Sequence, residues 1–140
     1  MVEKEALTLY EYMATIDRVV DGDTVDMVID QGFHTLRKQR CRVAGIDTPE
    51  VRTRDPMERK YGIRAYDRVC ELLQEGVKYH VRIDRLDKYG RALATIHVDH
   101  TKTLASILIE ERLAVRYDGQ NKDEIRAAHR ANWAYLEQEK

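Results

Sequence analysis

Residues 40–50 read Arg-Cys-Arg-Val-Ala-Gly-Ile-Asp-Thr-Pro-Glu, a hydrophobic and basic run that ends in two carboxylates. Pro49 fixes its own backbone φ and pushes the residue before it toward an extended conformation. The chain therefore bends between Asp47 and Glu50, so that both carboxylates can point into one small space. Arg42 brings positive charge to the same neighbourhood. Two acids and an arginine at the end of a strand suit a site that holds a cation and a phosphate together.

The stretch from Asp47 to Glu50 also fits the start of a helix. In that interpretation Asp47 is the N-cap and Glu50 reaches back to it, as in a capping box. The segment that follows favours a loop instead, because residues 51–56 show no apolar periodicity and Pro56 would interrupt a helix. We therefore expect residues 47–56 to form a loop that holds the two carboxylates.

The composition indicates a globular protein. A chain of 140 residues that is 43% hydrophobic and 35% charged can bury one hydrophobic core. We expect a charged lead-in over residues 1–11 and a single domain over residues 12–140. No apolar run approaches the ~20 residues that span a membrane, and the N-terminus lacks the apolar core of a signal peptide. The sequence as given indicates a cytoplasmic or other intracellular protein, with a trimmed secreted form as the alternative.

The overall charge excludes one class of function. A net charge of -1 and a pI near 6.5 do not suit a protein that coats long polyanions. Local basic clusters nevertheless border the carboxylates on both sides: Arg37, Lys38, Arg40 and Arg42, then Arg52, Arg54, Arg59, Lys60 and Arg64. Such runs are often solvated faces. Because both clusters border the same acids, we predict a rim that attracts anions.

Hydrophobic periodicity predicts five strands and three helices. Apolar and β-branched stretches bounded by turn residues predict strands over residues 13–20, 24–29, 33–46, 77–83 and 91–98. Helical spacing of apolar residues predicts helices over residues 57–75, 103–113 and 123–139. Three strands, one helix, two strands and two helices are how a five-stranded Greek-key barrel of the OB type is connected. The sequence therefore predicts an α+β fold built mainly from a β-barrel.

Two predicted turns place charged side chains at the starts of strands. Asp21 and the glycine after it favour a tight hairpin turn, because glycine accepts positive φ. That turn does not require a second acid, yet Asp23 follows where the next strand begins and where backbone pairing would hold it rigidly. In the second turn, residues 87–91 read Asp-Lys-Tyr-Gly-Arg, and Arg91 would be held in the same way. Each stretch by itself is also compatible with a plain surface turn.

The remaining cysteine, histidine and tryptophan positions indicate no further site. Cys41 and Cys70 lie in apolar patterns, and we expect both to be reduced core residues. His97 and His100 come closest to a zinc-ligand spacing, and we interpret them as a pair at the end of a strand. Trp133 on the last predicted helix is interpreted as a core residue rather than a base-stacking one.

Taken together, the motifs resemble those of the staphylococcal nuclease family, also called the thermonuclease family. The matching pieces are Asp-Gly-Asp-Thr at 21–24, Arg42 followed by Asp-Thr-Pro-Glu at 47–50, Lys-Tyr-Gly at 60–62 and Asp-Lys-Tyr-Gly-Arg at 87–91. Each piece is weak by itself, whereas all of them in this order are specific. The resemblance runs from about residue 14 to residue 136. It implies an OB-fold barrel that cleaves the phosphodiester bonds of DNA and RNA, especially in single-stranded or unpaired regions, and leaves 3′-phosphate products.

The resemblance also implies a bound Ca²⁺ ion, with Mg²⁺ or Mn²⁺ as alternatives. Asp23 and Asp47 resemble its carboxylate ligands, and Thr48 resembles a ligand through its backbone carbonyl. Asp21 resembles an outer group that acts through water. A hard dication prefers oxygen ligands at ~2.3–2.6 Å and tolerates irregular geometry, which these residues and water can supply.

Three charged residues carry the chemistry that the resemblance implies. Glu50 resembles the general base, or at least the residue that positions the attacking water. Arg42 and Arg91 resemble the two cations on the scissile phosphate. Arginine suits this role because its planar fork binds phosphate oxygens bidentately and stays charged. Contacts to the terminal phosphate and base of the substrate are implied for Lys88, Tyr89 and Tyr117.

Two features depart from the family pattern. The best-known secreted member is strongly basic, whereas this chain is not, which argues against tight binding of long nucleic acid. Arg112 stands where that member has a helix-ending glycine, so the second helix is expected to end differently.

Two other functions compete with a nuclease. An OB barrel that only binds nucleic acid or a protein partner is the main alternative, and an assembly protein that uses the third helix is the next. A pure binder needs no complete set of metal-binding, proton-accepting and arginine side chains. The sequence therefore favours the nuclease, with no obligate protein partner and no attachment to a membrane.

Overall fold

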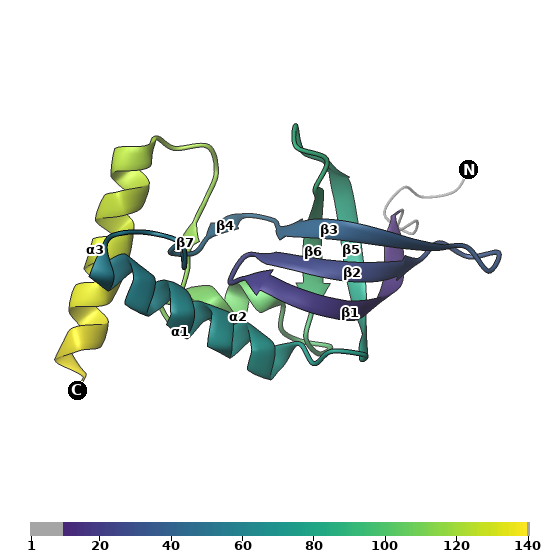
Figure 1. Cartoon of the computed structure of the whole chain (residues 1–140), viewed down its shortest axis with the longest axis horizontal. Coiled ribbons are helices and arrows are strands. Elements are labelled where there is room, and N and C mark those ends of the chain that lie inside the picture. The colour runs from purple at the N-terminus through teal and green to yellow at the C-terminus, as the bar shows by residue number, and fades with distance from the viewer. Residues whose placement is uncertain (1–9, 140) are drawn as a thin grey trace.

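A closed five-stranded barrel forms the centre of the computed structural model, which describes residues 10–139 (Figure 1). The strand order around the barrel is β1-β2-β3-β6-β5. Its strands are β1 (Glu11–Asp21), β2 (Thr24–Asp30), β3 (Leu36–Val43), β5 (Lys78–Leu86) and β6 (Ala92–His97). The predicted α+β fold with a five-stranded barrel of the OB type is confirmed.

The barrel closes because β1 pairs with two neighbours. Its first half pairs with β5, and nearly its whole length pairs with β2. Two register shifts in the β1–β2 ladder, the first between Ile16 and Arg18, mark bulges that bend the strand. A short parallel pairing of β3 with β6 completes the ring. Side chains from successive strands fill the interior, among them Val25, Cys41, Val81, Ala94 and Ile96.

The predicted strand over residues 33–46 is wrong at both ends. Phe33 and His34 have φ of 55° and 61°, a left-handed backbone that does not continue a strand, so β3 begins further on. At the other end Gly45 has a φ of 80°, and the chain leaves the barrel wall there. The residues beyond this turn form a separate two-stranded sheet of β4 (Ile46–Asp47) and β7 (Val115–Arg116).

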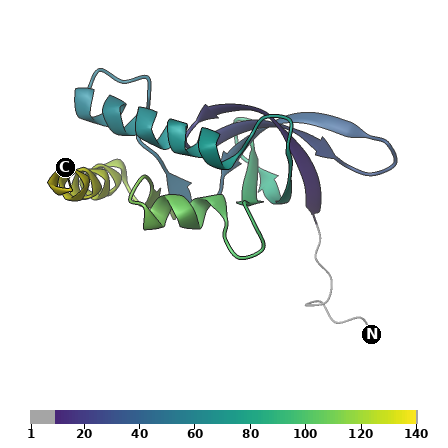
Figure 2. The same cartoon turned by 90° about the horizontal axis from the view of Figure 1, so that it is seen from below.

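Three helices lie beside and beyond the barrel: α1 (Pro56–Leu72), α2 (Leu104–Glu110) and α3 (Lys122–Gln138). α1 packs on β1 and α2 on β6, whereas α3 packs on β7 away from the barrel (Figures 1 and 2). α1 begins at Pro56, and the Asp55 carboxylate caps it by accepting from the backbone amides of Met57 and Glu58. Pro56 therefore opens a helix, where its missing N–H is not needed, rather than interrupting one.

The second helix ends at a left-handed residue. α2 stops before the predicted residue 113, and Arg112 has a φ of 61°, the conformation that a helix-ending glycine usually supplies. The guanidinium of Arg112 lies 3.9 Å from the centre of the Tyr135 ring. This cation–π contact offsets part of the backbone strain and ties α2 to α3.

The cysteine and tryptophan predictions are partly confirmed. Cys41 is buried in the barrel, but Cys70 is exposed, so its prediction as a core residue is wrong. The buried face of α1 runs through Ala65 and Val69, and Cys70 falls one residue beyond it. Trp133 is buried and stacks on Tyr61 with ring centres 5.8 Å apart, which confirms its role in packing.

The predicted charged lead-in over residues 1–11 lies outside the described residues except at its end, where Glu11 already belongs to β1. Within residues 10–139, none of the helices has the length and apolarity that crossing a membrane requires.

Gly62 allows the carboxylate loop to rest against α1. A Cβ atom at Gly62 would lie 2.6 Å from the carbonyl oxygen of Glu50 and 3.0 Å from that of Pro49. Both are backbone atoms that cannot rotate out of the way, so only glycine fits here without displacing the loop. Glycine lowers the helix propensity of α1, and the close contact between α1 and the loop compensates for this loss.

We expect Gly62→Ala to destabilise the fold, although alanine is the better helix former. Overpacking of this kind typically costs ~1–3 kcal/mol, whereas the gain in helix propensity is ~1 kcal/mol. Urea denaturation should give a lower free energy of unfolding than wild type. Cys70→Ala, on the exposed side of the same helix, is the control and should stay near wild type. A Gly62→Ala protein at least as stable as wild type would show that the loop does not rest on α1.

Candidate active site

Strand pairing brings the predicted metal ligands together around Arg42. Thr24 and Arg42 pair between β2 and β3, and the Val43 amide donates to the carbonyl oxygen of Asp23 at 2.8 Å. Asp23 is therefore fixed by backbone contacts and is only 9% exposed. The Arg42 guanidinium lies 3.3 Å from Asp23 Oδ2 and 3.4 Å from Asp47 Oδ1. One cation thus joins the carboxylate of Asp23, in the turn before β2, to that of Asp47 in β4.

Thr48 joins the same cluster from the turn after β4. Its backbone amide donates to Asp23 Oδ2 at 3.1 Å, which ties the loop to the start of β2. Its side-chain hydroxyl is buried, and among the described residues it has no hydrogen-bond partner. This hydroxyl lies beside Gly22, where a Cβ atom would come within 3.0 Å of it, so the backbone carbonyl of Thr48 stays the predicted ligand. The carboxylates of Asp23 and Asp47 are the hard oxygen donors that Ca²⁺ or Mg²⁺ prefers.

The pKa values of two further carboxylates, Asp21 and Glu50, are raised near this cluster. Burial raises the pKa of Asp21, and the charge of Asp23 raises it further, against the opposing effect of nearby arginines. Desolvation also raises the pKa of Glu50, and the charges of Glu58 and Asp47 add to it. Neighbouring carboxylates repel one another when they are ionised, so a cation bound between them is stabilised.

The second predicted arginine, Arg91, is held by Asp87. Its Nε lies 2.8 Å from Asp87 Oδ2, while the amides of Tyr89 and Arg91 donate to Asp87 Oδ1 at 2.9 and 3.0 Å. One carboxylate therefore shapes the β5–β6 turn and orients the guanidinium. The sequence prediction assigned no role to Asp87, although it opens the motif that contains Arg91.

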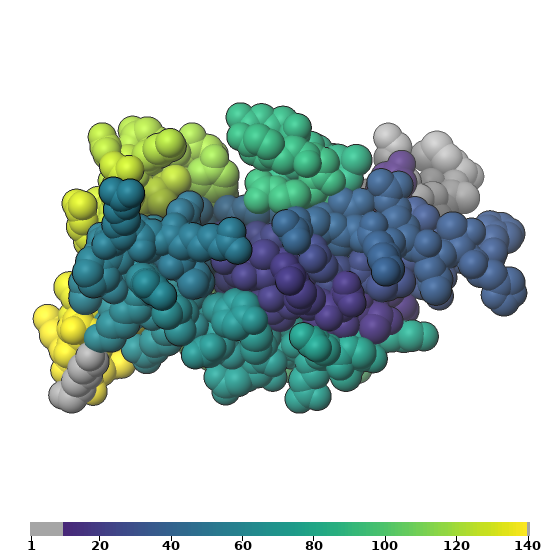
Figure 3. All heavy atoms as spheres, in the orientation of Figure 1, coloured from purple at the N-terminus to yellow at the C-terminus, as the bar shows by residue number. Residues whose placement is uncertain are grey.

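Most of the predicted site residues line one groove with a volume of about 1260 Å³. Those that line it are Arg42, Asp47, Thr48, Glu50, Lys88, Tyr89, Arg91 and Tyr117. Asp21 and Asp23 do not line the groove, but Asp23 reaches it through its contacts with Arg42 and Thr48. Figure 3 shows the groove as a notch between the β5–β6 hairpin and the segment that leads into α3.

Exposed tyrosines stand at the groove beside positive charges. Tyr89 is 71% exposed and Tyr117 is 44% exposed. The Lys88 Nζ and the Arg91 guanidinium lie 5.2 and 5.4 Å from the centre of the Tyr89 ring. Aromatic faces next to cations can stack on bases while the cations bind phosphates.

Most of the basic residues predicted to form an anion-attracting rim do not line the groove. Of the two basic clusters in the sequence, only Arg42 lines the groove. Arg40, for example, pairs instead with Asp26, its Nε lying 2.8 Å from Oδ1. Basic side chains of α3 line the groove in their place: Lys122, Arg126 and Arg130. Their spacing of four residues places them on one helix face, a signal that was present in the sequence.

His129 is a site residue that the sequence prediction missed. Its Nε2 lies 2.8 Å from Asp47 Oδ2, and its side chain is only 6% exposed. The ring stacks near Trp133 with centres 6.0 Å apart, so core packing fixes its orientation. The available signal was its position four residues before Trp133, on the same face of α3. His129 and Arg42 thus contact opposite oxygens of the Asp47 carboxylate.

Comparison with known proteins identifies the family. The family model described as "Staphylococcal nuclease homologue" matches residues 40–139, which is more than half of the chain. The chain belongs to the staphylococcal nuclease family. The resemblance that the motifs predicted is thereby confirmed.

Several curated proteins align with much of the chain. It is 36% identical over 103 residues to Endonuclease YncB of Bacillus subtilis (strain 168), and 38% identical over 103 residues to SPbeta prophage-derived endonuclease YokF of the same organism. Each match covers 71% of this chain, but 46% and 32% of the two relatives. Protein ParB of Escherichia coli is 31% identical over 91 residues, 64% of this chain and 44% of that protein. The chain therefore spans less than half the length of these curated relatives.

We expect Glu50→Gln to raise the free energy of unfolding at neutral pH. The raised pKa of Glu50 means that the folded state disfavours the ionised carboxylate. This cost is present above the raised pKa and disappears as the pH falls below the ordinary value of 4.5, where both states bind the proton. Denaturation at neutral pH and near pH 4 should therefore show the gain only at neutral pH.

The exposed Glu75→Gln variant is the matched control for this measurement and should change little at either pH. A Glu50→Gln protein that is less stable than wild type at neutral pH would contradict the repulsion inferred among the carboxylates.

Proposed function

We propose that the chain is a divalent-metal-dependent nuclease that hydrolyses phosphodiester bonds of DNA and RNA, with Ca²⁺ as the preferred ion. The observation that carries this proposal is the groove in which a carboxylate cluster, two arginines and exposed tyrosines converge. Two relatives that are named endonucleases support the same class of reaction.

Asp23 and Asp47 would hold the ion, together with Thr48, and Asp21 would act through water. The contacts of Asp23 with the Thr48 amide, and of Asp47 with His129, orient these carboxylates before any ion arrives. When bound, the ion would neutralise phosphate charge as a Lewis acid. Preorganisation of this kind matters because small misplacements of reacting groups lower the rate strongly.

Arg42 and Arg91 would stabilise the negative charge that builds on the phosphate oxygens during attack by water. Arg42 already lines the groove, where it also donates to the carbonyl oxygens of Val43 and Ile46 at 3.3 and 3.0 Å. Glu50 would take the proton of the attacking water or orient that water. Its raised pKa makes it a better proton acceptor than an ordinary glutamate.

The new phosphorus–oxygen bond would form as the bond to the 5′ oxygen breaks, which leaves a 3′-phosphate. Lys88, Tyr89 and Tyr117 would bind the substrate beside this phosphate. A base can stack on an exposed tyrosine only if it is not already stacked in a duplex, so the groove favours single-stranded or unpaired regions. The net charge of -1 supports short contacts of this kind over extended binding to long nucleic acid.

Incubation of the protein with plasmid DNA and with RNA should give degradation that Ca²⁺ stimulates and EDTA abolishes. Glu50→Gln and Arg42→Lys should each lower the rate by ~100–1000-fold, the usual loss when a preorganised catalytic group is removed. Glu75→Gln, which makes the same change at an exposed distant position, should retain the wild-type rate. Intact substrates under all conditions would reject the nuclease, and retained binding of single strands would then favour the binding module.

The tyrosine and arginine roles can be separated kinetically. Tyr89→Ala should raise KM for a single-stranded oligonucleotide by ~10–100-fold with kcat near wild type, because stacking contributes ~1–3 kcal/mol per base. Tyr89→Phe keeps the aromatic face and should behave like wild type. Arg91→Lys should lower kcat instead. If Tyr89→Ala lowered kcat and left KM unchanged, the substrate-binding role of Tyr89 would be wrong.

A further inference from the structure

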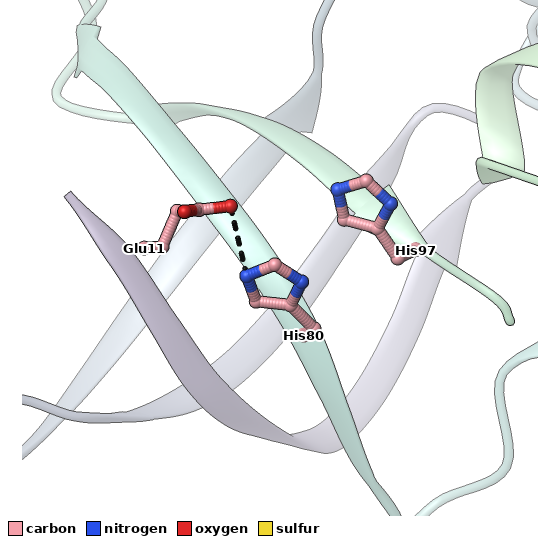
Figure 4. A group of neighbouring side chains, drawn as sticks. All are labelled: Glu11, His80 and His97. Atoms are coloured by element: carbon pink, nitrogen blue, oxygen red, sulfur yellow. Dashed lines mark ion pairs between the residues drawn. The ribbon is translucent and has the colours of Figure 1, made fainter. Parts of the chain in front are cut away.

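A second group of ligating side chains lies on the barrel wall outside the groove. Glu11 of β1, His80 of β5 and His97 of β6 place their ligand atoms within 4.8 Å of one another (Figure 4). Glu11 Oε1 lies 2.9 Å from His80 Nε2. The rings of His80 and His97 stack with centres 4.8 Å apart and planes 14° apart. These three residues do not line the groove, and Glu11 is at the opposite end of β1 from Asp21.

Sheet register explains why the three side chains meet. His80 and His97 are directly opposite each other on β5 and β6. Met13 is opposite His80 on β1, so Glu11 lies two residues further along the same face. The neighbours of the histidines, including Val81, are buried inside the barrel, which turns the imidazoles outward. Three paired strands therefore hold the donors in place without a loop.

We propose that Glu11, His80 and His97 form a binding site for a late first-row divalent cation, with Zn²⁺ as its representative. Two imidazoles and one carboxylate are a donor set that proteins use for zinc and related ions, whereas Ca²⁺ prefers oxygen ligands alone. Tetrahedral zinc with bonds of ~2.0–2.2 Å holds its ligand atoms ~3.3–3.6 Å apart, so atoms that lie up to 4.8 Å apart need to approach by about 1.5 Å at most. The His80 side chain is 45% exposed and the Glu11 side chain 24% exposed, which leaves room for such rotation.

The surrounding charges are compatible with this site. Arg82 is opposite Glu11 in the β1–β5 ladder, but its Nε lies 3.8 Å from Asp84 Oδ1, which partly neutralises it. The sequence spacing suggested His100 as the neighbour of His97, and His100 is instead exposed in the turn after β6. The partner of His97 comes from the adjacent strand, and sequence spacing alone does not reveal it.

An ion at this site would stabilise the place where the barrel closes. β1 meets β5 there, and Glu11 is the first residue of β1. A ligand that binds the folded state but not the unfolded one raises the unfolding temperature with its concentration. The proposed ion is therefore structural, and it is distinct from the ion of the groove in both donor set and position.

Calorimetric titration of the full, tag-free chain with Zn²⁺ tests the proposal. An excess of Ca²⁺ is included to occupy the oxygen ligands of the groove. We expect one Zn²⁺ ion per chain and a higher Tm with Zn²⁺ than with Ca²⁺ alone. His97→Ala and His80→Ala should each weaken binding by more than about tenfold, since even outer partners of metal ligands contribute that much. Both positions face outward, and the Tm of each variant without Zn²⁺ checks that it folds.

His34→Asn is the control, because it removes an exposed histidine in the loop between β2 and β3 and should leave binding unchanged. No Zn²⁺ binding by the wild type would overturn the proposal, as would equal affinity in His97→Ala. Loss of binding in His100→Ala would overturn the assigned ligand set. Nuclease activity is not the readout, so the outcome is independent of the function proposed for the groove.

Discussion

The carboxylates of Asp23 and Asp47 lie close together because the guanidinium of Arg42 lies between them. Two acids at this separation would repel each other strongly in a partly buried setting, where charge interactions are weakly screened. The arginine removes that repulsion, and its own side chain is only 15% exposed. Truncating it would remove the cation that the two carboxylates share, which is more costly at this partly buried place than losing an exposed ion pair. The residue proposed to act on the phosphate is thus also the one that allows the acidic cluster to exist.

The geometry of the groove also depends on the backbone that positions Asp47 next to Arg42. The left-handed turn at Gly45 ends the barrel strand, and β4 then pairs with β7 from the far end of the chain. That pairing brings α3 alongside, so that His129 contacts the second oxygen of Asp47. Gly62 supplies the remaining support, because α1 can approach the loop backbone only where no Cβ intervenes. Four separate segments therefore determine the position of one carboxylate.

Sequence reasoning recovered the features that rest on local patterns. Alternating and helical periodicities predicted the order of the barrel strands and helices along the chain, and the turn motifs predicted that Asp23 and Arg91 would be held at strand starts. It failed where a local pattern continued through a break. Residues 33–46 keep the character of a strand, yet positive φ at Phe33, His34 and Gly45 interrupts it, and no side-chain periodicity reports such a change.

The missed parts of the groove come from tertiary contacts. His129 and Asp47 are separated by 82 positions, and no motif links them. The cations of α3 were visible as a helical face, but the sequence did not say which surface that face would meet. The basic clusters near the carboxylates were more conspicuous, yet most of their members do not line the groove. Arg40 and Lys60, for example, pair with Asp26 and Glu137 instead.

The long-range contact between β4 and α3 also affects when the groove can form during synthesis of the chain. Asp47 is synthesised 82 residues before its imidazole partner, so the carboxylate is made well before the contact with His129 can form. The groove therefore gains the wall that α3 forms only after residues 122–138 have been made, and a shorter nascent chain lacks the contact to the second oxygen of Asp47.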